Sequence, residues 1–386
     1  MSPAPRRRVA ILATWYPTAS RPGSGVFVRE QARALAAVAD VVVIYPDPDG
    51  DRPRRAAWTI EDAIEDGLRT IRIHVARPRI PGVRLVLFAA AVRSALRRLA
   101  REDWIPDVLH AHVVFAATFA LPARRRRMPL VVTEHYSGFA LGTVTGFHLW
   151  LARFTFARAD LVCPVSENLA GHLRRLGVKA RMVVMPNAID TRRFHPGPER
   201  RHGGPVRALL VAGLTEVKQV PVLLDALALA RSRPGAPEIL LDVAGDGPLL
   251  EELRQRADAL GLGAAVRWLG RRNGAEVADL MRESDLVVLS SRWENLPVVL
   301  LEAMASGLPV VAPAVGGVRE IVDDDSGAVV PSGDVRALAD ALIGVASRLP
   351  AYDPAALQAR AVERYGFEAV RNRWLRVYDE LIAARA

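Results

Sequence analysis

Two glutamates eight residues apart are the side chains whose spacing first indicates chemistry. Glu294 lies in a short loop after the apolar run 286–290, and Glu302 lies about two turns into the helix expected next. That helix is expected to begin with Asn295 as its N-cap and Pro297 in its first turn. Its free N–H groups would bind an anion such as a diphosphate, and the carboxylates would accept hydrogen bonds from sugar hydroxyls. From spacing alone, two glutamates that merely flank a buried helix would give the same pattern.

A glycine-rich loop in the first half of the chain also has residue types that can contact phosphate. Gly23 and Gly25 follow the apolar run Val9–Ala13 and precede an amphipathic segment, with Ser24 as the expected N-cap. Glycines let the backbone approach a phosphate closely, and a helix N-terminus attracts its charge. An ordinary turn would have the same composition.

Three histidines follow or end neighbouring apolar runs. His110 and His112 lie at the end of 108–112, and His135 follows 130–133. Because the carboxyl ends of parallel strands meet at one edge of a sheet, we expect the three to gather there. Such a cluster can bind a metal ion, but we predict no metal site and interpret His110 as a packed strand residue.

Short β-branched runs alternate with segments of helical period, which is typical of parallel sheets with crossover helices. The pattern breaks near 187–205, which is rich in proline and glycine, and then restarts. The expected helices that flank the first motifs are Val26–Val38 and Arg84–Ala100. The expected strands are Val9–Ala13, Val41–Tyr45, Val108–His112, Leu130–Thr133, Leu161–Val165, Arg207–Val211, Ile239–Ala244, Val266–Leu269, Leu286–Ser290 and Pro309–Ala312.

The length and composition fit two domains of ordinary size. The chain has 386 residues, of which 51% are hydrophobic and 24% charged, so an intrinsically disordered chain is excluded. We predict two doubly wound α/β domains with a ligand cleft between the carboxyl ends of their sheets. No apolar run approaches the ~20 residues that span a bilayer.

The compartment is predicted from the N-terminus and from cysteine usage. Arg6–Arg8 and the apolar run after them imitate a secretory signal, but that run has only about five residues, so we interpret it as a strand. The single cysteine, Cys163, has no partner for a disulfide, which favours the reducing cytoplasm.

The motifs together resemble those of the family-4 glycosyltransferases, retaining enzymes of the two-domain GT-B fold. Residues 290–309 resemble the donor-site signature of that family. Further motifs follow the family order over nearly the whole chain: Trp15-Tyr-Pro17, Ser24–Gln31, Pro186–Asp190, Val243–Pro248 and Gly316–Glu320. The N-terminal motifs resemble members that build cell-surface polysaccharides, including polymers of the teichuronic-acid type.

This resemblance implies a role for each matching residue. Glu302 would hold the ribose of a nucleoside-diphosphate sugar, Glu294 would bind the donor sugar, and Lys218 would neutralise the leaving diphosphate. Lys218 is one of only two lysines, beside 50 arginines, and a compact ammonium differs from a planar guanidinium; a solvated lysine at a helix start is the alternative. The backbone of Asn295 and Leu296 would line the donor, as would that of Gly23 and Gly25.

The resemblance also implies acceptor chemistry and a domain division. His112 or His135 would hydrogen-bond the donor sugar or the acceptor. Residues 1–190 would form the acceptor-binding domain and 191–365 the donor domain, while 366–386 would form a helix that crosses back to the first domain. No cofactor or metal is required, and no general base is assigned, because the usual proposal is same-face attack with the leaving phosphate accepting the proton.

One departure from the family pattern concerns charge at the diphosphate. The family commonly has an arginine where this chain has Gly213, and Gln219 replaces the glycine after the lysine. We hypothesise that Arg292, Arg271 or Arg272 supplies the missing charge. Asp47 and Asp49 imitate the Asp-x-Asp metal motif of the other glycosyltransferase fold, but we interpret them as an acidic, solvated turn.

The charge is unevenly distributed between the halves. Residues 1–195 carry 30 Lys and Arg against 16 Asp and Glu, a net of +14, whereas 196–386 carry 22 against 26, a net of −4. The basic half fits an anionic or lipid-linked glycan acceptor and an anionic membrane surface, at the inner face of the cell membrane. The alternatives were a nucleic-acid or membrane-surface binder, for which no nucleic-acid motif exists, and a nucleotide-sugar epimerase of the same architecture.

Overall fold

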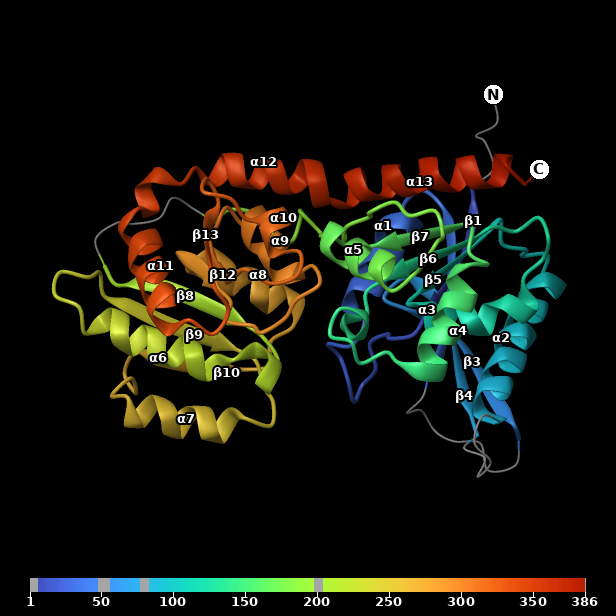
Figure 1. Cartoon of the computed structure of the whole chain (residues 1–386). Helices are drawn as coiled ribbons and strands as arrows, with labels where there is room; N and C mark the ends of the chain where they lie inside the picture. The colour runs from blue at the N-terminus through green and yellow to red at the C-terminus, as the bar shows by residue number, and fades with distance from the viewer. Residues whose placement is uncertain (1–5, 48–55, 77–82, 198–203, 386) are drawn as a thin grey trace. The chain divides into compact units, whose positions relative to one another are not determined.

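The chain consists of two compact units in the computed structural model, which describes residues 6–47, 56–76, 83–197 and 204–385 (Figure 1). The first unit comprises Met1–Ala188 and Phe367–Ala386, and the second comprises Ile189–Gly366. Part of the proline- and glycine-rich boundary predicted from the sequence, 198–203, lies outside the described residues.

The first unit is built on a sheet of seven strands within the described residues, in the order β3-β4-β2-β1-β5-β6-β7. All neighbouring strands are parallel except β3 and β4, which pair antiparallel at one edge. The strands are β1 (Arg8–Ala13), β2 (Asp40–Asp47), β3 (Trp58–Glu65), β4 (Leu68–Val75), β5 (Val108–His112), β6 (Leu130–Glu134) and β7 (Leu161–Pro164).

Helices cover this sheet in two groups. α1 (Val26–Ala36) and α13 (Phe367–Ala383) lie side by side, and their apolar residues pack with Val9, Ile11 and Ala13 of β1 in one buried cluster (Figure 1). α2 (Val83–Arg101), α3 (Val114–Ala120) and α4 (Gly146–Phe156) form the second group, in which α3 contacts both neighbours; α5 (Glu167–Arg175) follows β7.

The second unit has a wholly parallel sheet, which within the described residues has the order β10-β9-β8-β11-β12-β13. Its strands are β8 (Val206–Val211), β9 (Ile239–Ala244), β10 (Val266–Gly270), β11 (Leu286–Val288), β12 (Val310–Pro313) and β13 (Gly327–Val330). Its helices are α6 (Val220–Arg231), α7 (Leu250–Ala259), α8 (Gly274–Glu283), α9 (Val298–Ala305), α10 (Val318–Ile321), α11 (Val335–Ser347) and α12 (Pro354–Tyr365).

The prediction of two Rossmann-like α/β domains is confirmed, since each unit has a largely parallel sheet with crossover helices. Short 3-10 turns also occur: η1 (Leu121–Ala123), η2 (Ser137–Phe139), η3 (Glu216–Lys218) and η4 (Leu349–Ala351). Among the helices that the structure describes, none combines the length and the apolar composition needed to cross a lipid bilayer.

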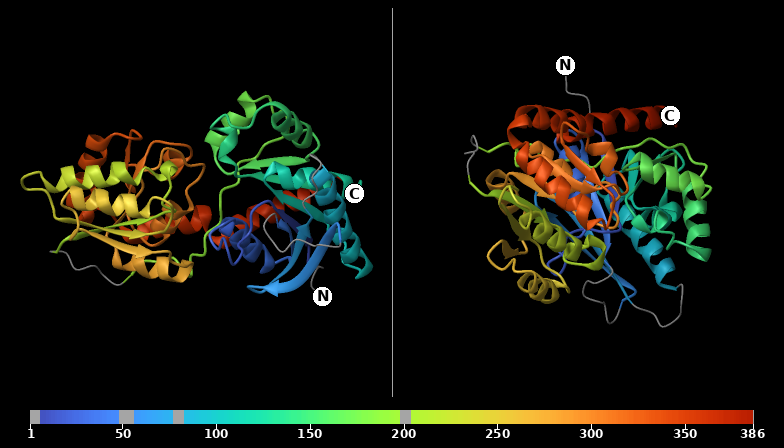
Figure 2. Two further views of the ribbon diagram at one scale, coloured as in Figure 1. Left: turned by 90° about the horizontal axis from the view of Figure 1, so that it is seen from below. Right: turned by 60° about the vertical axis from the view of Figure 1, so that its left-hand side comes forward.

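The sequence analysis did not predict the β3–β4 hairpin, the light-blue ribbon at the edge of the first sheet in Figure 2. Charged residues interrupt the apolar pattern of both strands. In the structure, Arg69 and Arg72 of β4 pair across the hairpin with Asp62 and Glu65 of β3, each at 2.7 Å. The turn between the strands, Asp66–Gly67, has positive φ at both residues, as a two-residue hairpin requires. That Asp-Gly pair was the overlooked signal.

The interpretation of Asp47 as part of a solvated turn was wrong. Asp47 is the last residue of β2, is buried, and lies 3.7 Å from the guanidinium of Arg72. An arginine on the adjacent strand compensates the buried charge, so the aspartate can remain in the sheet. Asp49 lies outside the described residues.

A buried polar contact fixes α13 to the first sheet. The hydroxyl of Tyr378 lies 2.6 Å from His110 Nδ1, whose Nε2 lies 2.6 Å from the hydroxyl of Thr133, and the indole of Trp374 packs on the His110 ring. His110 is therefore the packed strand residue that the sequence analysis expected. Because all three polar groups are buried, each needs its partner inside the protein.

We predict that Tyr378→Phe lowers the free energy of unfolding by about 1–3 kcal/mol, because it leaves His110 Nδ1 buried without a partner. Urea unfolding followed by circular dichroism measures the change. The matched control is Tyr352→Phe, whose hydroxyl only accepts a 3.4 Å bond from Arg348 at the surface and whose loss should cost less than about 0.5 kcal/mol. Equal effects of the two variants would contradict the prediction.

Candidate functional site

Lys218 and Glu294 form an ion pair at the carboxyl edge of the second sheet. Lys218 ends η3, which follows β8, and Glu294 lies in the loop after β11. Lys218 Nζ donates to Glu294 Oε1 at 2.6 Å, and both side chains are largely buried, with 27% and 13% of their surfaces exposed. The two residues predicted to act on the diphosphate and on the donor sugar thus lie side by side.

Neighbouring serines and backbone groups hold this pair in place. The hydroxyl of Ser291 donates to Glu294 Oε1 at 2.7 Å, and that of Ser290 donates to the carbonyl oxygen of Lys218 at 2.7 Å. The N–H of Arg292 donates to the carbonyl oxygen of Val217 at 2.7 Å, so the loops after β8 and β11 are joined directly. The sequence analysis assigned no role to these serines, although both immediately precede the glutamate loop.

Gln219, the residue after Lys218, adopts φ 45° and ψ 41° between η3 and α6. This left-handed conformation is one that glycine adopts without cost, whereas another residue pays about 1–2 kcal/mol. The family's usual glycine at this position therefore fits the turn, and Gln219 is held in it by the hydroxyl of Ser332, which lies 3.2 Å from its Oε1.

A glycine loop after β12 supports the Glu294 loop from the other side. The N–H of Gly317 donates to the carbonyl oxygen of Asn295 at 2.8 Å. Gly316 has φ 52°, and a Cβ atom there would lie 1.5 Å from the carbonyl oxygen of Glu294. Only glycine fits at 316 without displacing the loop.

The predicted start of the next helix was wrong. α9 begins at Val298 with Pro297 in extended backbone as its N-cap, so Asn295 belongs to the preceding loop. Its side-chain oxygen accepts a 3.2 Å bond from the indole N–H of Trp293. Leu296 is also kept out of the helix because it precedes a proline. Glu302 lies half-buried in the second turn of α9, as expected from its spacing.

The position of Gly213 is open, since no heavy atom lies within 4 Å of a Cβ built there. The three arginines considered as substitutes for the missing charge are exposed. Arg272 is paired with Glu276 at 3.1 Å at the start of α8, which occupies its charge. Arg271, after β10, and Arg292, beside Glu294 in sequence, remain candidates.

The glycine loop of the first unit is shaped by one close approach. Gly25, not Ser24 as predicted, is the N-cap of α1, and its φ is 65°. A Cβ atom on Gly25 would lie 2.1 Å from the carbonyl oxygen of Trp15, whereas Gly23 has open space around it. Gly25 is therefore required by packing against the end of β1, and Gly23 leaves the loop accessible.

His112 and His135 lie together at the carboxyl edge of the first sheet. His112 Nδ1 lies 3.0 Å from His135 Nε2, and the rings stack at 5.3 Å between centroids. Burial lowers the pKa of His112 to about 3, and burial with the neighbouring ring lowers the pKa of His135 well below 6.5, so the pair is neutral at pH 7. Among the described residues, no group of three or more His, Cys, Asp or Glu could hold a metal ion.

A buried carboxyl group that the sequence analysis gave no role organises this edge. Glu134, the last residue of β6, accepts hydrogen bonds from the N–H groups of Val114, His135 and Tyr136 at 2.8–3.0 Å. Burial raises the pKa of its carboxyl to about 7 against the opposing effect of these bonds. Between the strand end and α3, Val113 adopts φ 72°, a strained conformation for a β-branched residue. Glu134 thus fixes the backbone on both sides of the histidine pair.

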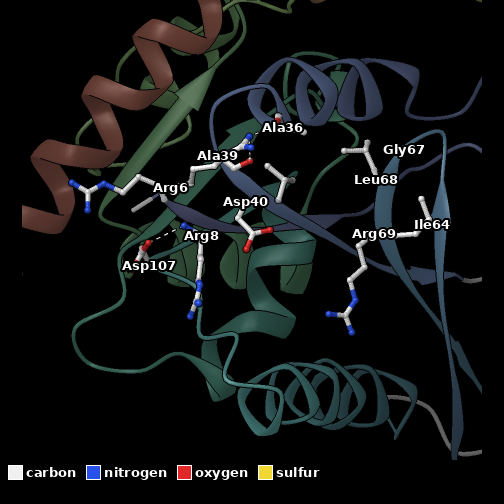
Figure 3. A pocket seen from close by; sticks show the side chains of 12 residues that line it. Arg6, Arg8, Ala36, Ala39, Asp40, Ile64, Gly67, Leu68, Arg69 and Asp107 are labelled. Carbon is white, nitrogen blue, oxygen red and sulfur yellow. Dashed lines mark hydrogen bonds between the residues drawn. The ribbon is translucent and has the colours of Figure 1, made fainter. Parts of the chain in front are cut away.

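A pocket at the opposite edge of the first sheet contains none of these residues (Figure 3). It has a volume of about 770 Å³ and is lined by the starts of β1 and β2 and by the β3–β4 turn. Two of its arginines have hydrogen-bond partners: the guanidinium of Arg8 donates to the carbonyl oxygen of Asp103 at 2.7 Å, and that of Arg69 pairs with Asp62. The candidate functional residues of each unit lie instead at the carboxyl edge of its own sheet, where ligands of such folds bind.

Family models match both halves of the chain. Residues 22–193 match the model described as Glycosyltransferase Family 4, and residues 192–350 match the model described as Glycosyl transferases group 1.

Characterised relatives match over most of their length. A glycogen synthase of Mycobacterium tuberculosis is 30% identical over 92% of this chain and 88% of the relative. A phosphatidyl-myo-inositol mannosyltransferase of Mycobacterium leprae is 32% identical over 76% and 78%. A putative teichuronic acid biosynthesis glycosyltransferase of Bacillus subtilis, TuaC, is 26% identical over 87% and 88%.

Solved structures share the fold. A sucrose-phosphate synthase from Thermosynechococcus elongatus superposes with a TM-score of 0.78 at 21% identity, covering 98% of this chain and all of that chain. The Anabaena protein HepE in complex with UDP-glucose superposes with a TM-score of 0.72 at 21% identity, covering 97% and 99%.

We predict that Gly316→Ala lowers the free energy of unfolding by about 2–4 kcal/mol. The new methyl group must displace the carbonyl group of Glu294, and the alanine must adopt a left-handed backbone conformation. Thermal unfolding measures the change. The matched control is Gly344→Ala in α11, where no atom lies within 4 Å and a helical alanine should add about 0.5–1 kcal/mol. A Gly316→Ala protein as stable as wild type would exclude the close approach described above.

We also predict that Glu134→Gln makes the protein more sensitive to acid. Because His112 and His135 are buried in the neutral form, the folded protein loses stability as the pH falls below 6.5: the unfolded chain then binds protons that the folded chain does not. Glu134 opposes this loss: its folded-state pKa is about 7 against 4.5, so its contribution increases as the pH falls from 7 to 4.5.

Melting temperatures between pH 7.5 and pH 4.5 test this expectation. Without the opposing carboxyl group, Glu134→Gln should show a steeper fall than wild type, by up to about 1.4 kcal/mol per pH unit within this window. Parallel curves for the two proteins would show that Glu134 does not titrate there.

Proposed function

Because this chain belongs to the family-4 glycosyltransferases, we propose that its second unit binds a nucleoside-diphosphate sugar and its first unit binds the acceptor that receives the sugar. The family assignment makes the chain a glycosyltransferase with the GT-B fold. It leaves the epimerase alternative without support. The donor is a nucleotide sugar, in line with the UDP-glucose of the HepE complex, and the proposal requires no cofactor.

The observation that carries this proposal is the Lys218–Glu294 pair. It places one compact cation and one carboxylate at the edge of a parallel sheet, where ligands of such folds bind. The cation suits the diphosphate, and the carboxylate suits sugar hydroxyls. Among the residues that the structure describes, Lys218 and Ser291 bond Glu294 at Oε1, so Oε2 remains available to a hydroxyl.

The same pair fits transfer with retention of anomeric configuration. Negative charge develops on the leaving diphosphate as the glycosidic bond breaks, and a cation already fixed in place stabilises it without reorganisation. Serine hydroxyls and backbone bonds hold Lys218 and Glu294 in this way. The leaving phosphate takes the proton of the acceptor in same-face attack, and no protein base is assigned. Asn295, Leu296 and Glu302 bind the diphosphate and ribose, with Arg292 or Arg271 adding charge.

In the first unit we place the acceptor, with the sugar being transferred, beside the histidine pair. His112 is fully buried, whereas His135 is half-buried and can reach a ligand, so His112 orients His135 through the 3.0 Å contact between their rings. Both rings are neutral at pH 7, which lets them donate and accept hydrogen bonds with hydroxyl groups. Gly23 and Gly25 are the candidates of the first unit for backbone contacts to a phosphate group.

The acceptor that we propose is an anionic or lipid-linked glycan, met at the inner face of the cell membrane from the cytoplasm. The net charge of +14 in residues 1–195 supports this choice, because basic surfaces attract anionic lipids and phosphates. The name of the mannosyltransferase relative includes phosphatidyl-myo-inositol, and that of TuaC includes teichuronic acid biosynthesis. The proposal therefore gives the two halves different tasks, donor binding and acceptor binding.

We predict that Lys218→Met lowers the turnover of sugar transfer by about 100-fold, because the charge that develops on the diphosphate loses its fixed cation. Lys179→Met is the matched control, since Lys179 is the other lysine of the chain and is exposed in the first unit. Turnover is measured with the UDP-, GDP- or ADP-sugar that most raises the melting temperature of wild type; a ligand at 100 times its Kd adds about 2.7 kcal/mol.

The control should keep wild-type turnover. Loss of activity in both variants would indicate a nonspecific effect of removing a lysine. Wild-type turnover in Lys218→Met, or no stabilisation of wild type by any sugar nucleotide, would contradict the proposed donor site.

A further inference from the structure

An exposed ridge of aromatic side chains runs along α4 in the first unit. Phe147, Trp150 and Phe154 lie on one face of this helix, at spacings of three and four residues, and are 60%, 57% and 37% exposed. Their rings stack in sequence with centroids 5.7 and 5.5 Å apart. Large aromatic groups gathered on a surface mark an interaction site. The core requires none of them, since Ala152, Thr155 and Phe156 form the buried face of the helix.

The charges around the ridge are of one sign. The sequence from Tyr136 to Arg158, which contains all of α4, has no acidic residue. Arg153 and Arg158 are exposed, and the Arg158 guanidinium lies over the Phe154 ring, 3.4 Å from its centroid. α2, which lies with α3 and α4 on the same side of the first unit in Figure 1, also lacks acidic residues and carries five arginines.

Aromatic rings connect the ridge to the proposed acceptor site. The ring of Phe147 contacts that of His148, which contacts Phe115, which in turn contacts Tyr136, at 6.1–6.5 Å between centroids. Tyr136 follows His135 directly and is fixed by the same Glu134 carboxyl group. A series of neighbouring rings therefore links the ridge to the histidine pair.

We propose that the α4 ridge, Phe147, Trp150 and Phe154 with Arg153 and Arg158, docks this enzyme on an anionic phospholipid bilayer. The rings enter the interface between headgroups and acyl chains, where tryptophan is enriched, and the arginines contact lipid phosphates. A second copy of the chain is a poorer occupant, because two surfaces without acidic residues repel each other. The inference rests on the proposed lipid-linked acceptor, since docking would bring the histidine pair to a substrate embedded in the membrane.

Cosedimentation of the full chain with vesicles tests the proposal. Wild type should bind phosphatidylglycerol–phosphatidylcholine vesicles about tenfold more tightly than pure phosphatidylcholine vesicles, and high salt should weaken the binding. The double variant Phe147→Ser, Trp150→Ser should bind the anionic vesicles about tenfold less tightly. Arg158→Glu keeps both rings and should lose the preference for anionic vesicles.

The matched control is Ile64→Ser, which removes an apolar side chain that is 70% exposed on β3 of the same unit. Its vesicle binding should equal that of wild type. All variants should keep wild-type stabilisation by the sugar nucleotide, which reports the donor site separately. Failure of that stabilisation in wild type would count against the proposed function and not against docking.

Three results would overturn the docking proposal. The first is that wild type binds neither kind of vesicle, and the second is that the double variant and wild type bind anionic vesicles equally. The third is that wild type is a dimer in solution which the double variant converts to a monomer, with no vesicle binding by either, because the ridge would then be a surface for self-association.

Discussion

The ion pair between Lys218 and Glu294 is the interaction on which the rest of the donor site depends. Opposite charges this close and this well buried are stable only where further polar groups complete their hydrogen bonding. Ser291 donates to the Glu294 carboxylate, Ser290 donates to the backbone carbonyl oxygen of Lys218, and the close approach of Gly316 fixes the carbonyl group of Glu294. Several loops of the second sheet are therefore built around one pair of charges.

In the first unit, a buried carboxyl group and two neutral imidazole rings hold the loops at the carboxyl edge of the sheet. Glu134 holds three backbone N–H groups around the ends of β5 and β6, and the strained backbone of Val113 lies between them. These hydrogen bonds position the backbone that carries His112 and His135. In both units some strained or closely packed backbone lies at the carboxyl edges of the strands, at Val113 in the first unit and at Gln219 and Gly316 in the second.

Sequence reasoning succeeded where an element is apolar and continuous. The strands at Ile239–Ala244 and Val108–His112 were predicted with the bounds that the structure has, because buried parallel strands are short and mostly apolar runs. It failed where the local structure depends on contacts with residues outside the segment. From the sequence alone β3 and β4 resemble charged loops, because the pairing of Arg69 with Asp62 and of Arg72 with Glu65 is not visible there. Asn295 resembles an N-cap, but in the structure its side chain accepts a bond from Trp293 and its carbonyl group accepts one from Gly317.

The sequence by itself determined the family, the two α/β domains and the residues proposed for the site, because these follow from local periodicity and from motifs with fixed spacing. Only the tertiary structure decided that Lys218 pairs with Glu294 and that Glu134 organises the histidines. The aromatic ridge also needed the structure, since periodicity shows that Phe147, Trp150 and Phe154 share a face but not that the face is exposed. Pairing and exposure depend on which distant segments fold against one another, and the local sequence pattern does not contain that information.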